Sequence, residues 1–285
     1  MNPFAVPKRL SFFTLTILAF LLLSVVSCRH KPQVTSLVLY EYDDNPFENN
    51  PDTTGVQISI KLQLPSIEGL KGDKLNAMKK VRVGIMETIL SPYYHGSDDP
   101  DEAIARYADS IRSEFIDGAL KDVYNLDELA SGFGIQNLSA NVVLSDDKLM
   151  VVSCHTEAFT GGIDMMYSDE YLVFDLTTGE QVKEEHLFGN PTVSMETRNA
   201  IRDMLVEALA QQMVDSVPEL DNVYEMDNVV MNGNFEVKAD SLVYHYNPYE
   251  VAPPAIGPVA IALPSYRLAA YMNPQSPVYK FWFSK

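Results

Sequence analysis

Alternating apolar and polar positions predict two strands near the start of the chain. In VQISIKLQL, residues 56–64, every second side chain is apolar, which is the pattern of a strand with one buried face. Residues 34–42 show a similar strand-like run. The stretch NPFENNPDTTG between them is rich in residues that break regular structure. We therefore expect a hairpin with a long loop.

Two helices are predicted next. Apolar residues recur at helical spacing over residues 73–90. A second helix is expected to begin at Pro100 with Asp99 as its cap, because proline fits the first turn and a short acidic side chain accepts a hydrogen bond there. The apolar stripe of this helix ends before Gly118, which we expect to lie just beyond the helix.

Strand patterns dominate the second half of the chain. A meander is predicted over residues 135–144, 149–160, 170–176 and, less regularly, 180–187. The clearest helical pattern follows over residues 195–214, with Ser194 as its cap. Short strands are then expected over residues 235–237, 242–246 and 259–263. This order predicts an α+β fold, with antiparallel sheets and helices packed on one face, rather than a doubly wound sheet.

The first 28 residues carry the features of a lipoprotein signal. Lys8 and Arg9 precede an apolar run over residues 10–26, which leads into Val-Val-Ser-Cys28, a lipobox-like sequence. We expect cleavage before Cys28 and acylation of this cysteine, including palmitate, which would anchor the protein in a membrane. An uncleaved membrane anchor is the alternative.

These patterns divide the chain into five parts. They are a signal peptide over residues 1–27, a tether over 28–33, two tandem α+β sub-domains over 34–129 and 130–270, and a tail over 271–285. The length fits one large domain or two small ones. No internal repeat is visible in the sequence.

Acidic residues strongly outnumber basic ones. The sequence has 39 Asp and Glu against 21 Lys and Arg, a formal net charge of −18, and loss of Lys8 and Arg9 with the signal makes it −20. Such a chain repels nucleic acid, so no nucleic-acid partner is expected, and it attracts cationic partners. Alternatively, the acidity only keeps an exported protein soluble.

Arg29, directly after the cysteine, favours an anchor in the outer membrane with the protein facing the periplasm; exposure on the cell surface is left open.

Few residues are candidates for chemistry. Gly161-Gly162 lacks the strand-to-helix context of a phosphate loop and indicates a turn. Cys154 lies in an apolar strand and is expected to be a small buried hydrophobe. His155 and Glu157 share one strand face and Asp164 follows, so the three form either an acid–base or metal cluster or part of a solvated face. We assign no catalytic residue, metal site or cofactor.

A stretch rich in tyrosine and proline, YHYNPYEVAPPAIGP, covers residues 244–258. Its prolines restrict the backbone, and tyrosine is common at protein interfaces. The stretch is therefore either a stiff connection packed on the core or a preformed recognition surface.

Several of these motifs together resemble one domain family. They are FTGG at residues 159–162, YLVFDLTTG at 171–179, EHLF at 185–188 and LVYHYNPYEVAP at 242–253. They are similar to the RsiV/PdaC-like domain of unknown function, shared by the ectodomain of the lysozyme-sensing sigma-V anti-sigma factor and the non-catalytic part of a peptidoglycan deacetylase. The similarity covers residues 130–265, and residues 34–129 are similar in layout to the family's partner domain. It implies an α+β fold and a binding role.

The resemblance also directs attention to a loop. The family usually has Ala-His-Gly or a similar sequence after Gly-Gly, whereas this chain has Ile-Asp-Met-Met, so a changed ligand is expected there. The candidate ligand-binding residues from this loop and the tyrosine-rich stretch are Ile163, Asp164, Met165, Met166, Tyr167, Tyr246, Tyr249 and Glu250.

We therefore expect a lipid-anchored, non-enzymatic protein of the cell envelope that binds its ligand through the carboxy-terminal domain. The resemblance implies lysozyme, another basic cell-wall-active protein or a peptidoglycan component as its ligand, and direct signalling and deacetylation are not expected. One alternative is a hydrolase of cell-wall glycans or peptides that uses His155, Glu157 and Asp164. The other is a structural envelope lipoprotein without a soluble ligand.

Overall fold

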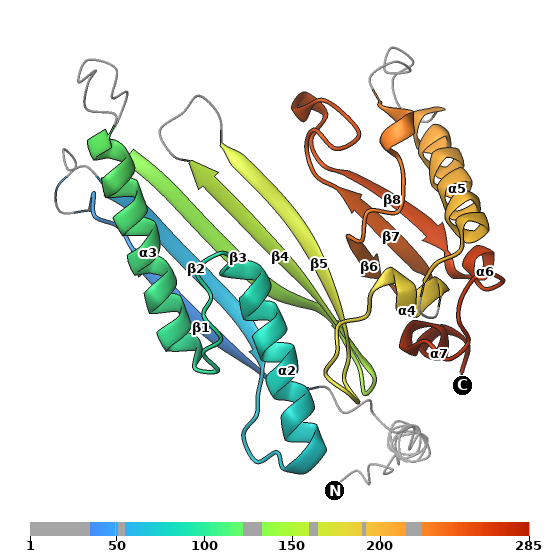
Figure 1. The fold of residues 1–285 in the computed structure, drawn as a ribbon, viewed down its shortest axis with the longest axis horizontal. Helices are drawn as coiled ribbons and strands as arrows, with labels where there is room; N and C mark the ends of the chain where they lie inside the picture. Colours follow the sequence, from blue (N-terminus) through green and yellow to red (C-terminus); the bar gives the residue numbers. More distant parts are fainter. Residues whose placement is uncertain are drawn as a thin grey trace, which may run out of the picture. The chain divides into compact units, whose positions relative to one another are not determined.

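A five-stranded sheet is the largest part of the fold (Figure 1). In the computed structural model its strands are, in spatial order, β1 (Leu37–Asp44), β2 (Gly55–Pro65), β3 (Phe133–Ser145), β4 (Leu149–Phe159) and β5 (Met166–Asp175). β2 and β3 run parallel, and the other neighbouring pairs of this sheet are antiparallel.

The structure describes residues 35–48, 50, 55–121, 133–159, 165–189, 192–214 and 224–284. Several sequence-based predictions lie outside these ranges: the signal peptide, the lipidated Cys28, the tether, the Gly161-Gly162 turn, Ile163 and Asp164.

Helices α2 (Gly72–Ile89) and α3 (Pro100–Lys121) cover one face of this sheet (Figure 1). Because side chains alternate along a strand, β2 directs Ile58, Ile60 and Leu62 to this face, where they are fully buried. They share an apolar core with Val81 and Ile85 of α2. On the other face, β1, β2 and β3 present exposed and half-buried side chains, so we call it the open face.

Three antiparallel strands form a second sheet. They are β6 (Phe235–Val237), β7 (Ser241–Tyr246) and β8 (Val259–Pro264). Helix α5 (Met195–Val214) packs on β8. The shorter helices are α4 (Glu184–Phe188), α6 (Ser265–Leu268), α7 (Pro277–Phe283), η3 (Met226–Asn228) and η4 (Pro254–Ile256). Among the helices in the described ranges, none is long and apolar enough to span a membrane.

The second sheet and its helices pack on one end of β4 and β5. Leu149 and Val151 of β4 and Val173 of β5 belong to the apolar core of the second sheet. Met150 and Val152, which alternate with them, belong to the core under α2 and α3. This end of β4 is therefore buried on both faces, which explains its continuous apolar sequence.

The α+β class predicted from the sequence is confirmed. Helix α5 spans the predicted residues, and the Ser194 hydroxyl accepts a hydrogen bond from the amide of Thr197 (3.1 Å). The Asp99 carboxylate likewise accepts one from the amide of Asp101 (3.1 Å) at the start of α3. β3, β4 and β5 form the predicted meander.

Three local predictions were wrong. In the fourth expected strand, only Gln181 bridges to β5, and the chain then turns into α4, which buries the adjacent Leu187 and Phe188. A strand would direct two adjacent side chains to opposite faces. Helix α3 continues past Gly118 to Lys121. The expected tail instead contains α7, with Val278 fully buried.

The boundary expected between residues 129 and 130 falls between β2 and β3 in the chain. These two strands pair with each other, so the two expected sub-domains share one sheet. A parallel pair needs a long crossover, which α2 and α3 supply here. Local hydrophobic patterns do not encode such a non-local pairing.

The Thr-Thr-Gly motif forms the turn after β5. Gly179 has a φ of 75°, in the left-handed region that favours glycine. A Cβ atom at this position would overlap the carbonyl of Ala77 in α2. The Asp175 carboxylate accepts a hydrogen bond from the amide of Thr177 (2.8 Å) and closes the turn from the other side. This motif therefore allows the turn to pack tightly against α2.

Candidate functional site

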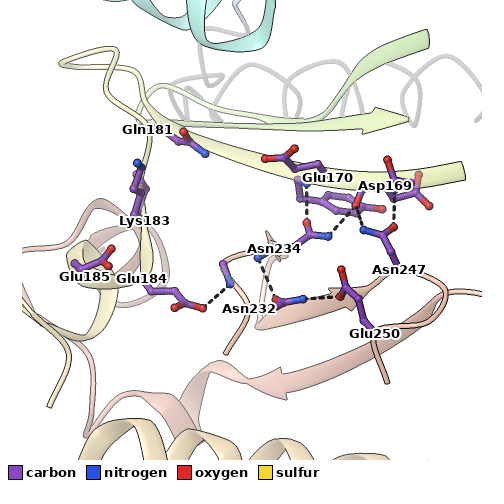
Figure 2. Close-up of a pocket in the computed structure, with 14 residues that line it drawn as sticks. Asp169, Glu170, Gln181, Lys183, Glu184, Glu185, Asn232, Asn234, Asn247 and Glu250 are labelled. Atoms are coloured by element: carbon purple, nitrogen blue, oxygen red, sulfur yellow. Dashed lines mark hydrogen bonds between the residues drawn. The ribbon is translucent and has the colours of Figure 1, made fainter. Parts of the chain in front are cut away.

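A polar cavity of about 520 Å³ lies between β5 and the loops of the second sheet (Figure 2). Its lining comes from β5, from the first turn of α4 and the residues before it, and from the loops before β6 and after β7. Five acidic residues line it: Asp169, Glu170, Glu184, Glu185 and Glu250. Lys183 is the one basic residue among the described residues of the lining. The cavity therefore favours cations over anions.

Two asparagine side chains bind the outer edge of β5 (Figure 2). Asn234 accepts a hydrogen bond from the amide of Tyr171 (2.8 Å) and donates one to the carbonyl of Asp169 (2.8 Å). Asn247 accepts from the amide of Asp169 (2.7 Å) and donates to the same carbonyl (3.2 Å). An asparagine amide carries both a donor and an acceptor, so it can replace the peptide group of a neighbouring strand. We call these two residues the asparagine clamp.

Glu184 is the buried acid of the cavity. It is 8% exposed, and its Oε1 atom accepts a hydrogen bond from the amide of Gly233 (3.0 Å), across the cavity in Figure 2. No basic side chain in the described ranges forms an ion pair with it. Burial raises the pKa of Glu184, although the Gly233 amide and the charge of Arg198 oppose the rise. A buried carboxylate without a counter-ion is unfavourable.

The loop before β6 organises the opposite wall. The Asn232 side chain donates to Glu250 Oε2 (3.2 Å) and to the carbonyl of His245 (2.8 Å), and its oxygen accepts from the amide of Asn234 (3.1 Å). Glu250 and the asparagine clamp are thereby held in one hydrogen-bonded network (Figure 2). The site can bind groups that donate hydrogen bonds to fixed oxygen atoms.

His155, on the open face of β4, is held by two carboxylates. Its Nδ1 atom lies 2.7 Å from Asp169 Oδ1, and its Nε2 atom lies 3.4 Å from Glu157 Oε1. Burial by itself would lower the pKa of His155, but the hydrogen bonds to Asp169 and Glu157 outweigh it and raise the pKa. Asn137 donates to the other oxygen of Glu157 (3.0 Å).

The predicted acid–base cluster is thus assembled differently from expectation. His155 and Glu157 meet, and a second carboxylate, that of Asp169, also binds the ring, while Asp164 lies outside the described residues. Ser139 lies opposite His155 in the β3–β4 register, yet both ring nitrogens face carboxylates, and the Ser139 hydroxyl accepts from Asn141 (3.3 Å). No serine–histidine hydrogen bond forms within the described ranges, and no group of three His, Cys, Asp or Glu there could hold a metal ion.

His245 of β7 makes a further contact with β5. Its ring stacks on Tyr171, with 3.9 Å between the ring centroids. Its Nε2 atom lies 3.2 Å from Glu236 Oε2. Burial lowers the pKa of His245, against the opposing influence of Glu236. Polar and aromatic contacts therefore continue along the junction beside the asparagine clamp.

The predicted ligand-binding residues are only partly brought together. Met165, Met166 and Tyr167 lie at or just before the start of β5, where Met166 is 62% exposed. Tyr249 is 73% exposed, with a positive φ of 72°. Glu250 lines the cavity.

Tyr246 requires a correction, because its side chain is 1% exposed and belongs to the core of the second sheet. Its hydroxyl donates to the carbonyl of Val230 (2.8 Å). It alternates with His245 on β7, so it faces the core while His245 faces β5. The tyrosine-rich stretch is therefore part core and part cavity wall.

Sequence reasoning missed Glu184, Asn234 and Asn247. The Asn-Gly pair in MNGN, residues 231–234, is a turn signal that could have placed the loop before β6. The role of the clamp depends on β5, which is distant in the sequence, and no local pattern indicates it. The burial of Glu184 likewise arises from tertiary packing.

Cys154 behaves as predicted. It is a free cysteine, buried in the core under α2 and α3. Burial raises the pKa of its thiol to about 12, so the nucleophilic thiolate is strongly disfavoured.

The open face of the five-stranded sheet is also acidic. Glu41 and Asp43 of β1, Glu157 of β4 and Asp169 of β5 share this face by strand register. Lys61 of β2 is the one lysine or arginine that the described strands place there. The open face and the cavity thus present two acidic surfaces that meet at β5.

Comparison with known proteins gives a family match over the second sheet and structural matches over most of the chain. Residues 187–266 match the family described as a protein of unknown function (DUF3298). A DUF3298 family member from Bacteroides fragilis is similar in structure, with a TM-score of 0.71 and 19% identity over 88% of this chain and 99% of that chain. A DUF3298 family protein from Pseudomonas aeruginosa PAO1 has a TM-score of 0.55 and 14% identity over 87% and 97%. No curated protein matches the sequence. Residues 187–266 therefore match the DUF3298 family, within a fold that the chain shares with these two structures.

Proposed function

We propose that this protein is a lipid-anchored, non-enzymatic component of the cell envelope that binds a basic protein, with lysozyme as the most concrete candidate. The lipobox-like sequence at Cys28 supports the anchor. The RsiV/PdaC-like motifs support a binding role near the cell wall. The binding surface in this proposal is the open face of the five-stranded sheet.

The single observation that carries the proposal is the charge of the open face. Glu41 and Asp43 are exposed on the edge strand and form no ion pair with a described residue. Leu39 on the same strand face is 53% exposed, so apolar area adjoins the charges. A broad surface with unpaired carboxylates and some apolar area suits a cationic protein, whose approach the field would also accelerate.

The arrangement of His155 supports the non-enzymatic part of the proposal. Both ring nitrogens are engaged by carboxylates, and the neighbouring Ser139 is not hydrogen-bonded to the ring. A nucleophile and its base would need to lie within hydrogen-bond reach of each other. The pair of His155 and Asp169 instead links β4 and β5 across the open face.

Calorimetry of the mature protein with lysozyme tests the binding. We expect saturable binding at low ionic strength that weakens at about 0.3 M salt, because the surface charges are then screened. The double variant Glu41→Gln, Asp43→Asn should bind about tenfold more weakly. The matched control, Glu68→Gln with Asp73→Asn, removes two carboxylates between β2 and the first turn of α2 and should bind nearly as the wild type does.

Two results would contradict the proposal. Absence of lysozyme binding at low salt would remove lysozyme as the ligand. Equal weakening by both double variants would show attraction by net charge alone, without a defined surface. Cell fractionation tests the anchor: Cys28→Ala should move the protein from the membrane to the soluble fraction.

A further inference from the structure

We propose that the cavity between β5 and the second sheet binds an organic cation with N–H donors, an alkylammonium or guanidinium group, with Glu184 as the counter-charge. This site goes beyond the proposed function, because its lining, apart from Asp169 and Tyr171, lies off the open face. Such a cationic group can come from either of two sources: a free polyamine, or a basic side chain of a protein partner.

The first observation is the state of Glu184 itself. Glu184 is more than nine-tenths buried, and its carboxylate accepts a hydrogen bond from the amide of Gly233 and a weaker one from the hydroxyl of Tyr244, but it has no ion-pair partner in the described ranges. A buried carboxylate is retained at a cost unless a cation and further donors satisfy it. A cation entering the cavity would supply the missing charge and the missing donors together.

The second observation lies behind this carboxylate. Tyr244 is fully buried; its hydroxyl has no partner at close hydrogen-bond distance among the described residues and makes only a weaker side-chain hydrogen bond to Glu184. Burial, with the charge of Glu184 second, raises the pKa of Tyr244 well above its usual value, so the hydroxyl keeps its proton. The hydroxyl of Tyr244 therefore keeps unused hydrogen-bonding capacity next to the carboxylate of Glu184.

The remaining lining selects the ligand class. An anion would face five acidic residues and one lysine, Lys183, which is itself exposed. A metal ion would need a cluster of at least three closely spaced ligands, and the described residues hold no such group. Ammonium and guanidinium groups instead use separate hydrogen bonds to oxygens spread around a cavity, such as those of Glu184, Glu250 and Asn232. The cavity, about 520 Å³, is large enough for a polyamine or a lysine or arginine side chain.

Calorimetry of the mature protein with spermidine tests the proposal, with neutral triacetylspermidine as the control ligand. We expect saturable 1:1 binding of spermidine and none of the acetylated form. Glu184→Gln keeps an oxygen for the Gly233 amide but removes the charge, and it should weaken binding by about tenfold or more. Glu68→Gln removes an equal charge from an exposed loop and should change affinity less than about twofold. Thermal unfolding of each variant confirms that it is folded.

Failure would be recognisable. Lack of spermidine binding, or equal weakening by Glu184→Gln and Glu68→Gln, would overturn the cavity proposal. Retained lysozyme binding by Glu184→Gln would leave the proposed function of the open face intact. Loss of lysozyme binding in the open-face variant, with unchanged spermidine binding, would confirm that the two surfaces are separate. Displacement of spermidine by lysozyme would identify a protein side chain as the source of the cation, and lack of displacement would identify a free polyamine.

Discussion

Two different interfaces hold the five-stranded sheet in place. Its covered face packs on α2 and α3 through aliphatic side chains such as Ile60, Leu62 and Val81, all fully buried. At the edge of β5, Asn234 and Asn247 of the second sheet's loops are hydrogen-bonded to the strand backbone, beside the apolar packing of Val173. The first interface is apolar, whereas the second adds directional polar bonds to its apolar packing.

The difference indicates which interface can carry a ligand. Apolar packing leaves no polar group to recognise a solute, because its stabilisation comes from area removed from water. The β5 junction keeps a cavity, and the asparagine clamp already satisfies the amide and carbonyl of Asp169 and the amide of Tyr171. The clamp also occupies edge groups of β5 that could otherwise pair with another chain. The polar junction thus combines edge protection with a binding site.

Cavity formation in the covered core should produce the largest effect. Ile60→Ala removes three carbon atoms from a fully buried position in β2 and should lower the free energy of unfolding by about 2–5 kcal/mol. Ser59→Ala, on the open face of the same strand, should change it by about 0.5 kcal/mol or less. Urea denaturation measures both. A loss below about 1 kcal/mol for Ile60→Ala would show that this core can collapse around the cavity.

Breaking the clamp should have a smaller and more local effect. Asn234→Ala removes the acceptor for the Tyr171 amide and the donor to the Asp169 carbonyl, so we expect a loss of about 1–3 kcal/mol. Hydrogen exchange of the Tyr171 amide should accelerate, while amides in the centre of β2 keep their protection. Asn141→Ala is the matched control, because the side chain of this exposed asparagine is hydrogen-bonded only to the Ser139 side chain among the described residues. Unchanged exchange at Tyr171 would show that the clamp is dispensable.

The same contrast explains what the sequence could predict. The strand of residues 56–64 and helix α5 follow from hydrophobic periodicity, because burial of one face imposes that period. The parallel pairing of β2 with β3 depends on residues far apart in the chain, and no local period encodes it. The sequence around Leu187 and Phe188 is compatible with a strand or a helix. Tertiary packing, which buries both side chains, favours the short helix.

The site was less predictable than the fold. Glu250 was found through the tyrosine-rich stretch, and His155 and Glu157 through their spacing on one strand. Asn234 and Glu184 were missed because their importance arises from groups they meet across the fold, Tyr171 and Gly233. Hydrogen bonds between residues that are distant in sequence produce no periodic pattern of residue types, so the sequence alone does not predict them.

The smallest predicted effect concerns pH and the open face. Hydrogen bonds to Asp169 and Glu157 raise the pKa of His155 in the folded protein, so this residue stabilises the fold most fully below its unfolded pKa of about 6.5, and the contribution is lost as pH rises through the folded value. His155→Gln should therefore reduce the free energy of unfolding more at about pH 5.5 than at about pH 8.5. The residue is partly exposed, so the difference should be modest. In an Asp169→Asn background, the same substitution should show a weaker dependence on pH, because the main partner is gone. An equal loss at both pH values would mean that His155 contributes only packing, and that the charge pair between β4 and β5 does not strengthen the sheet beside the cavity.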